Sequence, residues 1–254
     1  MSKKSKLYIL CFSIIFLLFA LFTNNYVENF SNEVPAIIFM RHGKEIKGTA
    51  GKPDKTYQFG NYTRTLKSTQ QTLDPNDPYG IKGATLLFDK LQSKLKGKYK
   101  QIDTIITIDT NPNNNNWPTA NPFLTAYYYL EGDKDKTIKN FKLIDSKAPT
   151  SGEDGCDVKD IQPKELFDMT KTNGSVLVIG TRDTLWGPAP PPNVDPNTIP
   201  ADHSRLLYKY RKFFNTDKNN PPEKPTFPEK AKTVHIFSGE EGKGRLEKMD
   251  INQP

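Results

Sequence analysis

Residues 34–45 read VPAIIFMRHGKE, an apolar run that ends in an arginine, a histidine and a glycine. The uninterrupted run at 36–40 is rich in Ile and Phe, a pattern typical of a strand buried on both faces. The polar residues that follow it therefore lie at the carboxyl end of that strand. In open α/β sheets ligands bind at this edge, because the loops there vary while the strands hold them in place. Arg41, His42 and Gly43 therefore predict an anion site.

The rest of the chain alternates predicted strands and helices. Further strands are predicted at 102–108 (IDTIITI), 141–144 (FKLI), 175–180 (SVLVIG) and 233–237 (TVHIF), and helices at 83–95, 120–132, 163–172 and 204–214. Strands separated by helices indicate an α/β fold, a three-layer sandwich with a mostly parallel sheet and helices on both faces. The polar stretch 43–79 lacks clear periodicity and is expected to form excursions over the active edge. Two proline-rich segments, 187–200 and 219–230, are interpreted as loops inserted in this domain.

The totals exclude some function classes. The net charge of +7 over 254 residues is spread thinly, because runs of Lys are broken by Asp and Glu. Since no stripe of Arg interleaved with aromatic residues occurs, we expect no nucleic-acid partner. Diffuse positive charge favours an anionic ligand or a membrane surface. The 3 histidines are far apart and the cysteines are not paired, so we expect no metal site and no cofactor.

The first residues predict a membrane anchor in front of the folded domain. We divide the chain into a basic cytoplasmic tail (1–6), a transmembrane or signal-anchor helix (7–23), a polar spacer (24–33) and a domain (34–254). The uncharged apolar run is slightly shorter than the ~20 residues of a full span. No small-residue cleavage site follows clearly, which favours a retained anchor over a cleaved signal peptide. Both readings stay open.

The same segment predicts the location of the domain. The lysines before the apolar run hold the amino end in the cytoplasm, which places the domain on the lumenal or extracellular side of a single-pass membrane protein. If the segment is instead cleaved, the domain is secreted. Asn29, Asn61 and Asn173 begin N-x-S/T sequons, which agree with either location.

A buried strand that ends in Arg41-His42-Gly43 resembles the start of the histidine phosphatase superfamily, the phosphoglycerate-mutase-like proteins. The resemblance extends in order along the chain to GTRD at 180–183 and to the closing TVHIFSGEEGKGRLEKM at 233–249. It implies that His42 attacks phosphorus to form phosphohistidine and that Arg41 clamps the phosphoryl oxygens. It also implies that Gly43 lets a backbone N–H approach the phosphate, and that the ligand is a phosphorylated small molecule or another anion.

Two expected residues of that family are missing. The pattern R-A-x-x-T-A normally supplies a second arginine, and NNNNWPTANPFLTA at 113–126 contains none. A second histidine normally follows the fourth strand, where Thr181 stands. Arg182 and Arg64 are the candidate replacement cations for phosphate binding. Two aspartates directly after strands, Asp183 and Asp109, are candidate proton donors to the leaving group. The remaining histidines, His203 and His235, are interpreted as structural.

Two functions follow from these residues. One is a membrane-anchored phosphomonoester hydrolase that works through phosphohistidine at His42. The other is a catalytically degenerate phosphatase fold that binds phosphate or another anion, or has a structural role. The strand that ends in Arg41-His42-Gly43 favours the first, and the paired absence of the second arginine and second histidine favours the second.

Overall fold

The computed structural model describes residues 33–46, 53–66, 70–110, 120–131, 138–146, 161–186, 205–214 and 231–252. The chain divides into two units, Met1–Glu33 and Val34–Pro254, and the description below concerns the second. The predicted membrane segment 7–23, the residue His203 and both proline-rich loops lie outside the described residues. Over the described ranges, no helix has the length and apolar character needed to cross a bilayer.

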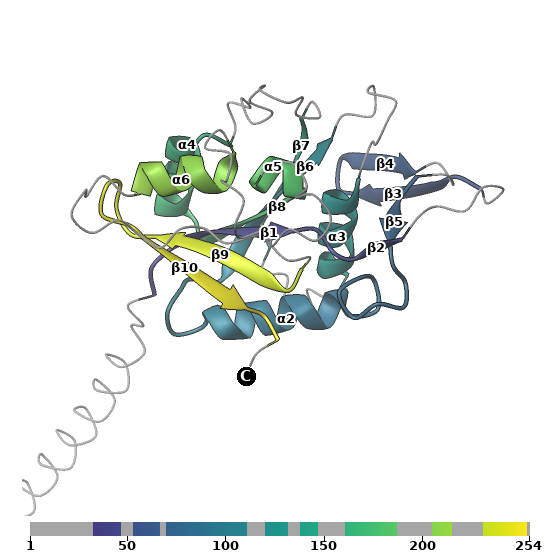
Figure 1. Ribbon diagram of the computed structural model, residues 1–254, viewed down its shortest axis with the longest axis horizontal. Helices are drawn as coiled ribbons and strands as arrows, with labels where there is room; N and C mark the ends of the chain where they lie inside the picture. Colours follow the sequence, from purple (N-terminus) through teal and green to yellow (C-terminus); the bar gives the residue numbers. More distant parts are fainter. Residues whose placement is uncertain are drawn as a thin grey trace, which may run out of the picture. The chain divides into compact units, whose positions relative to one another are not determined.

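A sheet of six strands forms the centre of the domain (Figure 1). The strands are β1 (Ala36–Arg41), β6 (Ile102–Thr110), β7 (Asn140–Ser146), β8 (Ser175–Gly180), β9 (Thr233–Ser238) and β10 (Arg245–Asp250). Their spatial order is β10-β9-β1-β8-β6-β7. The pairs β1–β8, β8–β6 and β6–β7 are parallel, whereas β9 pairs antiparallel with both β1 and β10. The prediction of a mostly parallel sheet is therefore confirmed.

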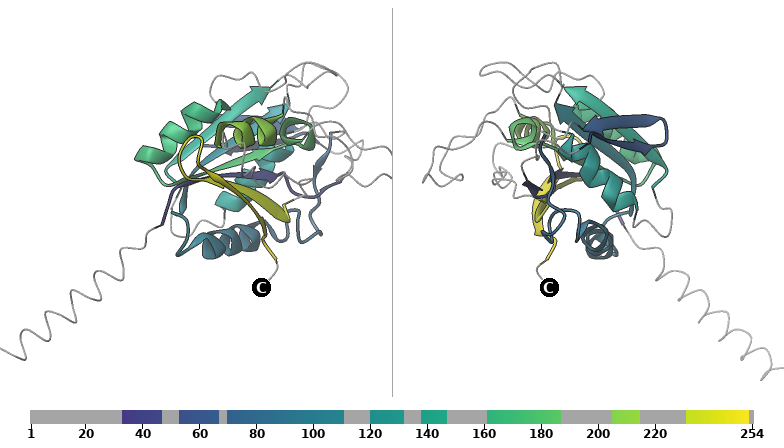
Figure 2. Two further views of the ribbon diagram at one scale, coloured as in Figure 1. Left: turned by 60° about the vertical axis from the view of Figure 1, so that its left-hand side comes forward. Right: turned by 90° about the vertical axis from the view of Figure 1, so that its right-hand side faces the viewer.

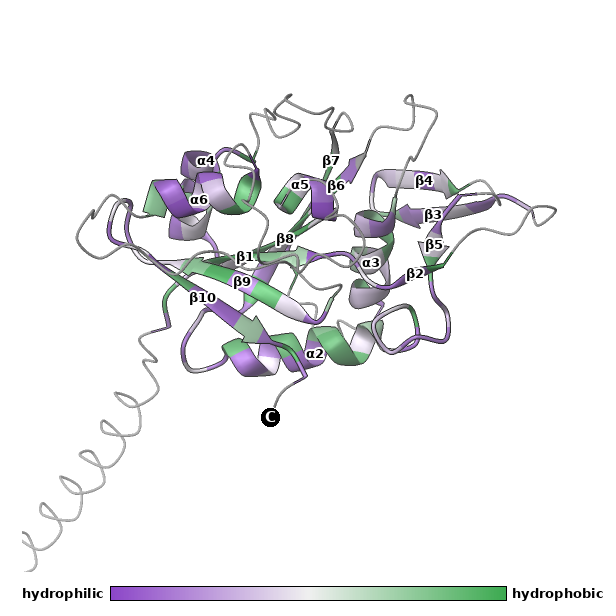
Figure 3. Ribbon diagram, viewed as in Figure 1, coloured by the Kyte–Doolittle hydropathy of each residue, from purple (hydrophilic) through white to green (hydrophobic). Residues whose placement is uncertain are grey.

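Helices cover both faces of this sheet, as the sequence predicts. They are α2 (Ala84–Leu95), α3 (Asn121–Leu130), α4 (Pro163–Thr172), α5 (Arg182–Leu185) and α6 (Leu206–Phe214). The helices α2 and α3 pack on one face, and α4, α5 and α6 pack on the other. The turned views of Figure 2 show α2 and α6 on opposite sides of the sheet. Both helices carry hydrophilic as well as hydrophobic residues, as Figure 3 shows, because each has one face towards solvent.

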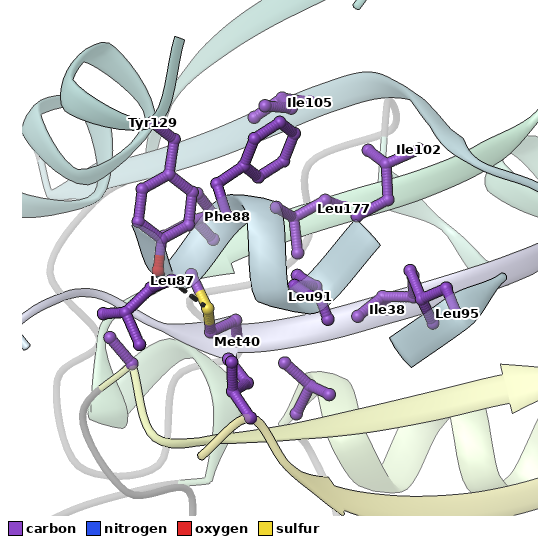
Figure 4. Close-up of a cluster of buried hydrophobic side chains, with 14 of the residues drawn as sticks. Ile38, Met40, Leu87, Phe88, Leu91, Leu95, Ile102, Ile105, Tyr129 and Leu177 are labelled. Carbon is purple, nitrogen blue, oxygen red and sulfur yellow. Dashed lines mark hydrogen bonds between the residues drawn. The ribbon is translucent and has the colours of Figure 1, made fainter. Parts of the chain in front are cut away.

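The core explains why the first strand is apolar throughout. Ile38 and Met40 point towards α2, where they meet the row of leucines that repeats every four residues in that helix (Figure 4). Ile37 and Phe39 point the other way and pack under α6. A strand with helices on both faces has no solvent side, so every residue from 36 to 40 is buried. The strand therefore holds Arg41 and His42 on a rigid base.

The polar stretch after β1 contains short strands that its sequence does not reveal. β2 (Glu45–Ile46) pairs with β5 (Thr72–Leu73), and β3 (Lys55–Phe59) forms a hairpin with β4 (Tyr62–Leu66). The hairpin packs through aromatic rings: Phe59 and Tyr62 both contact Phe141, with ring centroids 5.0 and 5.4 Å apart. These contacts fix the hairpin beside β7.

Candidate functional site

The carboxyl edge of the parallel strands gathers polar side chains at one level. The register of β1, β8 and β6 places His42, Thr181 and Asp109 in one row, each just past or near the end of its strand. Neighbouring strands lie about 4.8 Å apart, so the backbone at Asp109 is roughly 10 Å from that at His42. This edge is the expected location of a ligand in such a sheet.

The imidazole of His42 is held in a defined orientation. Its backbone N–H donates to the carbonyl of Gly180 at 3.0 Å. Its ring Nδ1 lies 2.9 Å from the carbonyl oxygen of Gly43. A carbonyl oxygen only accepts, so Nδ1 carries the proton in this contact and the neutral ring has its lone pair on Nε2. The side chain is buried, and Nε2 is therefore the nitrogen that can act as a nucleophile.

The loop after His42 is fixed by bonds to separate elements. The N–H of Gly43 donates to Thr125 Oγ1 on α3 at 2.9 Å, and the N–H of Lys44 donates to the carbonyl of Tyr79 at 2.8 Å. A Cβ at Gly43 would lie 2.6 Å from that same carbonyl oxygen, so close packing requires glycine here. A direct contact of the Gly43 N–H with phosphate stays a prediction, because in this geometry Thr125 accepts that hydrogen bond.

The guanidinium of Arg41 lies among several charged groups. Burial is the main cause that lowers the pKa of Arg41 to about 10, the positive charge of Arg182 lowers it further, and the negative charges of Glu45 and Asp183 oppose the shift. Arg182 in turn donates from Nε and Nη2 to Asp183 Oδ1, at 2.9 and 2.7 Å. Two of the predicted phosphate-binding arginines therefore act on one another at this edge, together with the candidate acid Asp183.

The other two candidates, Arg64 and Asp109, are bound to each other. Arg64 Nε donates to Asp109 Oδ2 at 3.1 Å, and Asp109 Oδ1 accepts from the backbone N–H of Phe123 at 3.0 Å. Asp109 is 2% exposed, and it satisfies a backbone donor in the first turn of α3. Both carboxylate oxygens thus accept hydrogen bonds in a way that suits the ionised form. This arrangement supports an anchoring role for Asp109.

The residues at the family's missing positions have local roles. Thr181 begins α5, and its Oγ1 accepts from the N–H of Thr184 at 3.2 Å, which is the bond of an N-cap. In the pattern R-A-x-x-T-A, Asn121 stands at the arginine, while Thr125 and Ala126 match the last two letters. Asn121 is fully buried as the first residue of α3. Neither Thr181 nor Asn121 can supply a positive charge or an imidazole.

Two functional candidates were missed by sequence reasoning. Glu45 Oε2 lies 3.9 Å from His42 Nδ1, and Thr125 holds the loop that carries His42. Glu45 closes the apolar-to-basic stretch on which the prediction was based, so its charge was a usable signal. The Thr-Ala pair in the family pattern was the signal for Thr125. In the part of the chain that the structure describes, no group of three His, Cys, Asp or Glu side chains is placed to hold a metal ion.

Comparisons with known proteins give only distant likenesses. No family model matches the chain, and no curated protein matches it. A solved structure of the protein histidine phosphatase SixA complexed with tungstate aligns with 16% identity and a TM-score of 0.40, covering 85% of this chain and 97% of that one. A candidate phosphohistidine phosphatase, SixA of Agrobacterium tumefaciens, aligns with 11% identity and a TM-score of 0.38, with the same coverage. Likeness at this level does not establish a family, so the assignment remains a resemblance carried by Arg41, His42 and Gly43.

Proposed function

We propose that this protein hydrolyses phosphate monoesters of small molecules through a phosphohistidine at His42. The observation that carries the proposal is the bond from Nδ1 to the carbonyl of Gly43 at 2.9 Å, which leaves the lone pair of the buried imidazole on Nε2. In the first step Nε2 bonds to phosphorus, and the ester P–O bond breaks with its electron pair on the leaving oxygen. In the second step water attacks phosphorus, the N–P bond breaks, and orthophosphate leaves.

The proposal assigns the phosphoryl charge to Arg41 and Arg182. Burial of the Arg41 guanidinium and the nearby charge of Arg182 both lower the pKa of Arg41, so a bound oxyanion would relieve an unfavourable accumulation of positive charge. Asp183 receives the role of proton donor to the leaving oxygen, because its charge also acts on this cluster. Arg64 is the weaker candidate, since Asp109 already accepts a hydrogen bond from it.

The test uses p-nitrophenyl phosphate and a broad panel of natural phosphate esters with the purified full-length chain in mild detergent. We expect release of orthophosphate that is lost in His42→Asn. His235→Asn is the matched control, because His235 is also buried but lies in the interior of β9. Turnover that survives His42→Asn would contradict the proposal.

A second function is supported by what the edge of the sheet lacks. Thr181 caps a helix, and Asn121 occupies the arginine position, so two expected catalytic groups have no direct replacement in kind. Loss of a general acid typically costs ~10² to 10⁴ in rate, and loss of a charge-stabilising donor ~10² to 10³. The alternative is therefore a degenerate phosphatase fold that binds phosphate or another anion without turnover. Orthophosphate binding that is abolished by Arg41→Gln, in a chain that releases no phosphate, would favour it.

We also propose that residues 7–23 anchor the domain to a membrane, with the amino end in the cytoplasm and the domain on the lumenal or extracellular side. The basic tail before the apolar run supports this orientation. Retention in the membrane pellet after alkaline carbonate extraction is expected, whereas cleavage and release would indicate a secreted protein. Asn61 is exposed at the turn between β3 and β4, so its sequon provides a glycosylation reporter of the location.

A further inference from the structure

A carboxylate lies behind the nucleophilic ring. Glu45 Oε2 is 3.9 Å from His42 Nδ1, on the side of the ring opposite to Nε2, and the Glu45 side chain is 17% exposed. Its backbone is fixed because β2 pairs Glu45 with Leu73 of β5. The carboxylate is therefore held near the ring by main-chain pairing as well as by its own charge.

We infer that Glu45 is a positioning residue that stabilises the positive charge of the His42 ring while Nε2 carries the phosphoryl group. This inference rests on the proposed phosphatase function and adds a residue to it. Bonding of the Nε2 lone pair to phosphorus, with the proton kept on Nδ1, leaves a formal positive charge on the imidazole. No proton moves to Glu45, because the Nδ1 proton is donated to the carbonyl of Gly43 throughout.

The electrostatic argument favours this role over simple packing. An opposite charge within about 4–6 Å of a titratable ring favours its cationic form by roughly one to three tenfold steps. The other charges that act on this edge are Arg41 from β1 and Arg182 and Asp183 from α5. The two arginines disfavour a cationic ring, so a carboxylate close to Nδ1 is needed to offset them. Thr125, the group that reaches the loop from α3, is neutral.

This role has a signature that a structural role lacks. A carboxylate near an anion site repels orthophosphate in the ground state, yet it stabilises the phosphorylated ring. Replacing Glu45 by its neutral isostere therefore separates the two effects. Turnover decreases, while the affinity for orthophosphate stays the same or increases. Damage to the fold or to the loop would lower both.

The experiment compares the full-length chain with Glu45→Gln, with the conservative variant Glu45→Asp, and with Glu131→Gln. Glu131 is an exposed carboxylate just after α3 and serves as the matched control. Turnover of p-nitrophenyl phosphate and calorimetric binding of orthophosphate are measured on each. We expect Glu45→Gln to lose about 10- to 100-fold in turnover without weaker phosphate binding, Glu45→Asp to recover part of the loss, and Glu131→Gln to match the wild type.

The outcomes separate this inference from the function beneath it. Wild-type turnover in Glu45→Gln, or parallel loss of turnover and phosphate affinity, would overturn the inference and leave the phosphatase proposal intact. A wild-type chain that releases no phosphate would remove the phosphatase proposal, and the role of Glu45 would fall with it.

Discussion

Replacing Thr125 with valine tests how the loop that carries His42 is held. The side chain keeps its shape, but it loses the hydroxyl oxygen that accepts from the Gly43 N–H at 2.9 Å. Thr125 is 1% exposed, so the donor left behind is buried without a replacement. An unsatisfied buried donor costs about 1–3 kcal/mol of unfolding free energy. At the midpoint of that range, a domain of this size loses roughly 4–8 °C in Tm.

Thr170→Val is the matched control for this substitution. Thr170 is also a buried threonine in a helix, and its hydroxyl donates to the helix's own Phe167 carbonyl at 2.7 Å, just as Thr125 donates to Asn121 at 2.8 Å. The two variants therefore lose the same kind of local bond, and they differ in the bond from Gly43. Thermal unfolding of the full-length chain by calorimetry measures the difference. Equal Tm values for the two variants would refute the role assigned to Thr125, as would unchanged phosphate turnover in an active chain.

Three further predictions concern the same edge. Gly43→Ala places a Cβ 2.6 Å from the carbonyl oxygen of Tyr79, so it should cost about 1–3 kcal/mol in a urea unfolding curve; an unchanged midpoint would show that the loop yields freely. Asp109→Asn keeps an acceptor for α3 but removes the charge that faces Arg64, and in a double-mutant cycle with Arg64→Met we expect a coupling of roughly 1 kcal/mol, against none if the pair is independent. Phosphate binding should weaken as the pH rises above the Arg41 pKa of about 10, because the anion binds the protonated guanidinium; in Arg41→Gln binding should be weak and flat across that pH, and a flat wild-type profile would contradict this.

The central sheet was predictable because its strands are buried on both faces. A continuous apolar run such as 36–40 or 175–180 has few alternatives once helices flank it, and the i, i+4 leucines of α2 point to one face. The short strands of the 43–79 stretch were not predictable in the same way. Each has two to five residues, and the β3–β4 hairpin is fixed by rings on α3 and β7 that lie far away in sequence.

The candidate site was predictable in its anchor and less so in its partners. Arg41 and His42 follow from the end of β1, because a strand fixes where its next residues emerge. The pairing of Arg64 with Asp109 joins residues 45 positions apart through a hairpin that has no local sequence signature. The partner of a charged side chain depends on tertiary packing, and the sequence alone leaves Asp109 equally suited to proton transfer and to capping a helix.

The account depends most on Nε2 of His42 as the atom that takes the phosphoryl group. The direct measurement mixes the full-length chain with p-nitrophenyl phosphate, quenches in base within the first turnover, and locates phosphoryl groups by mass spectrometry. We predict an acid-labile adduct on His42 that forms before orthophosphate is released and is absent from His42→Asn. Orthophosphate released without any such adduct, or an adduct on another residue, would contradict the account.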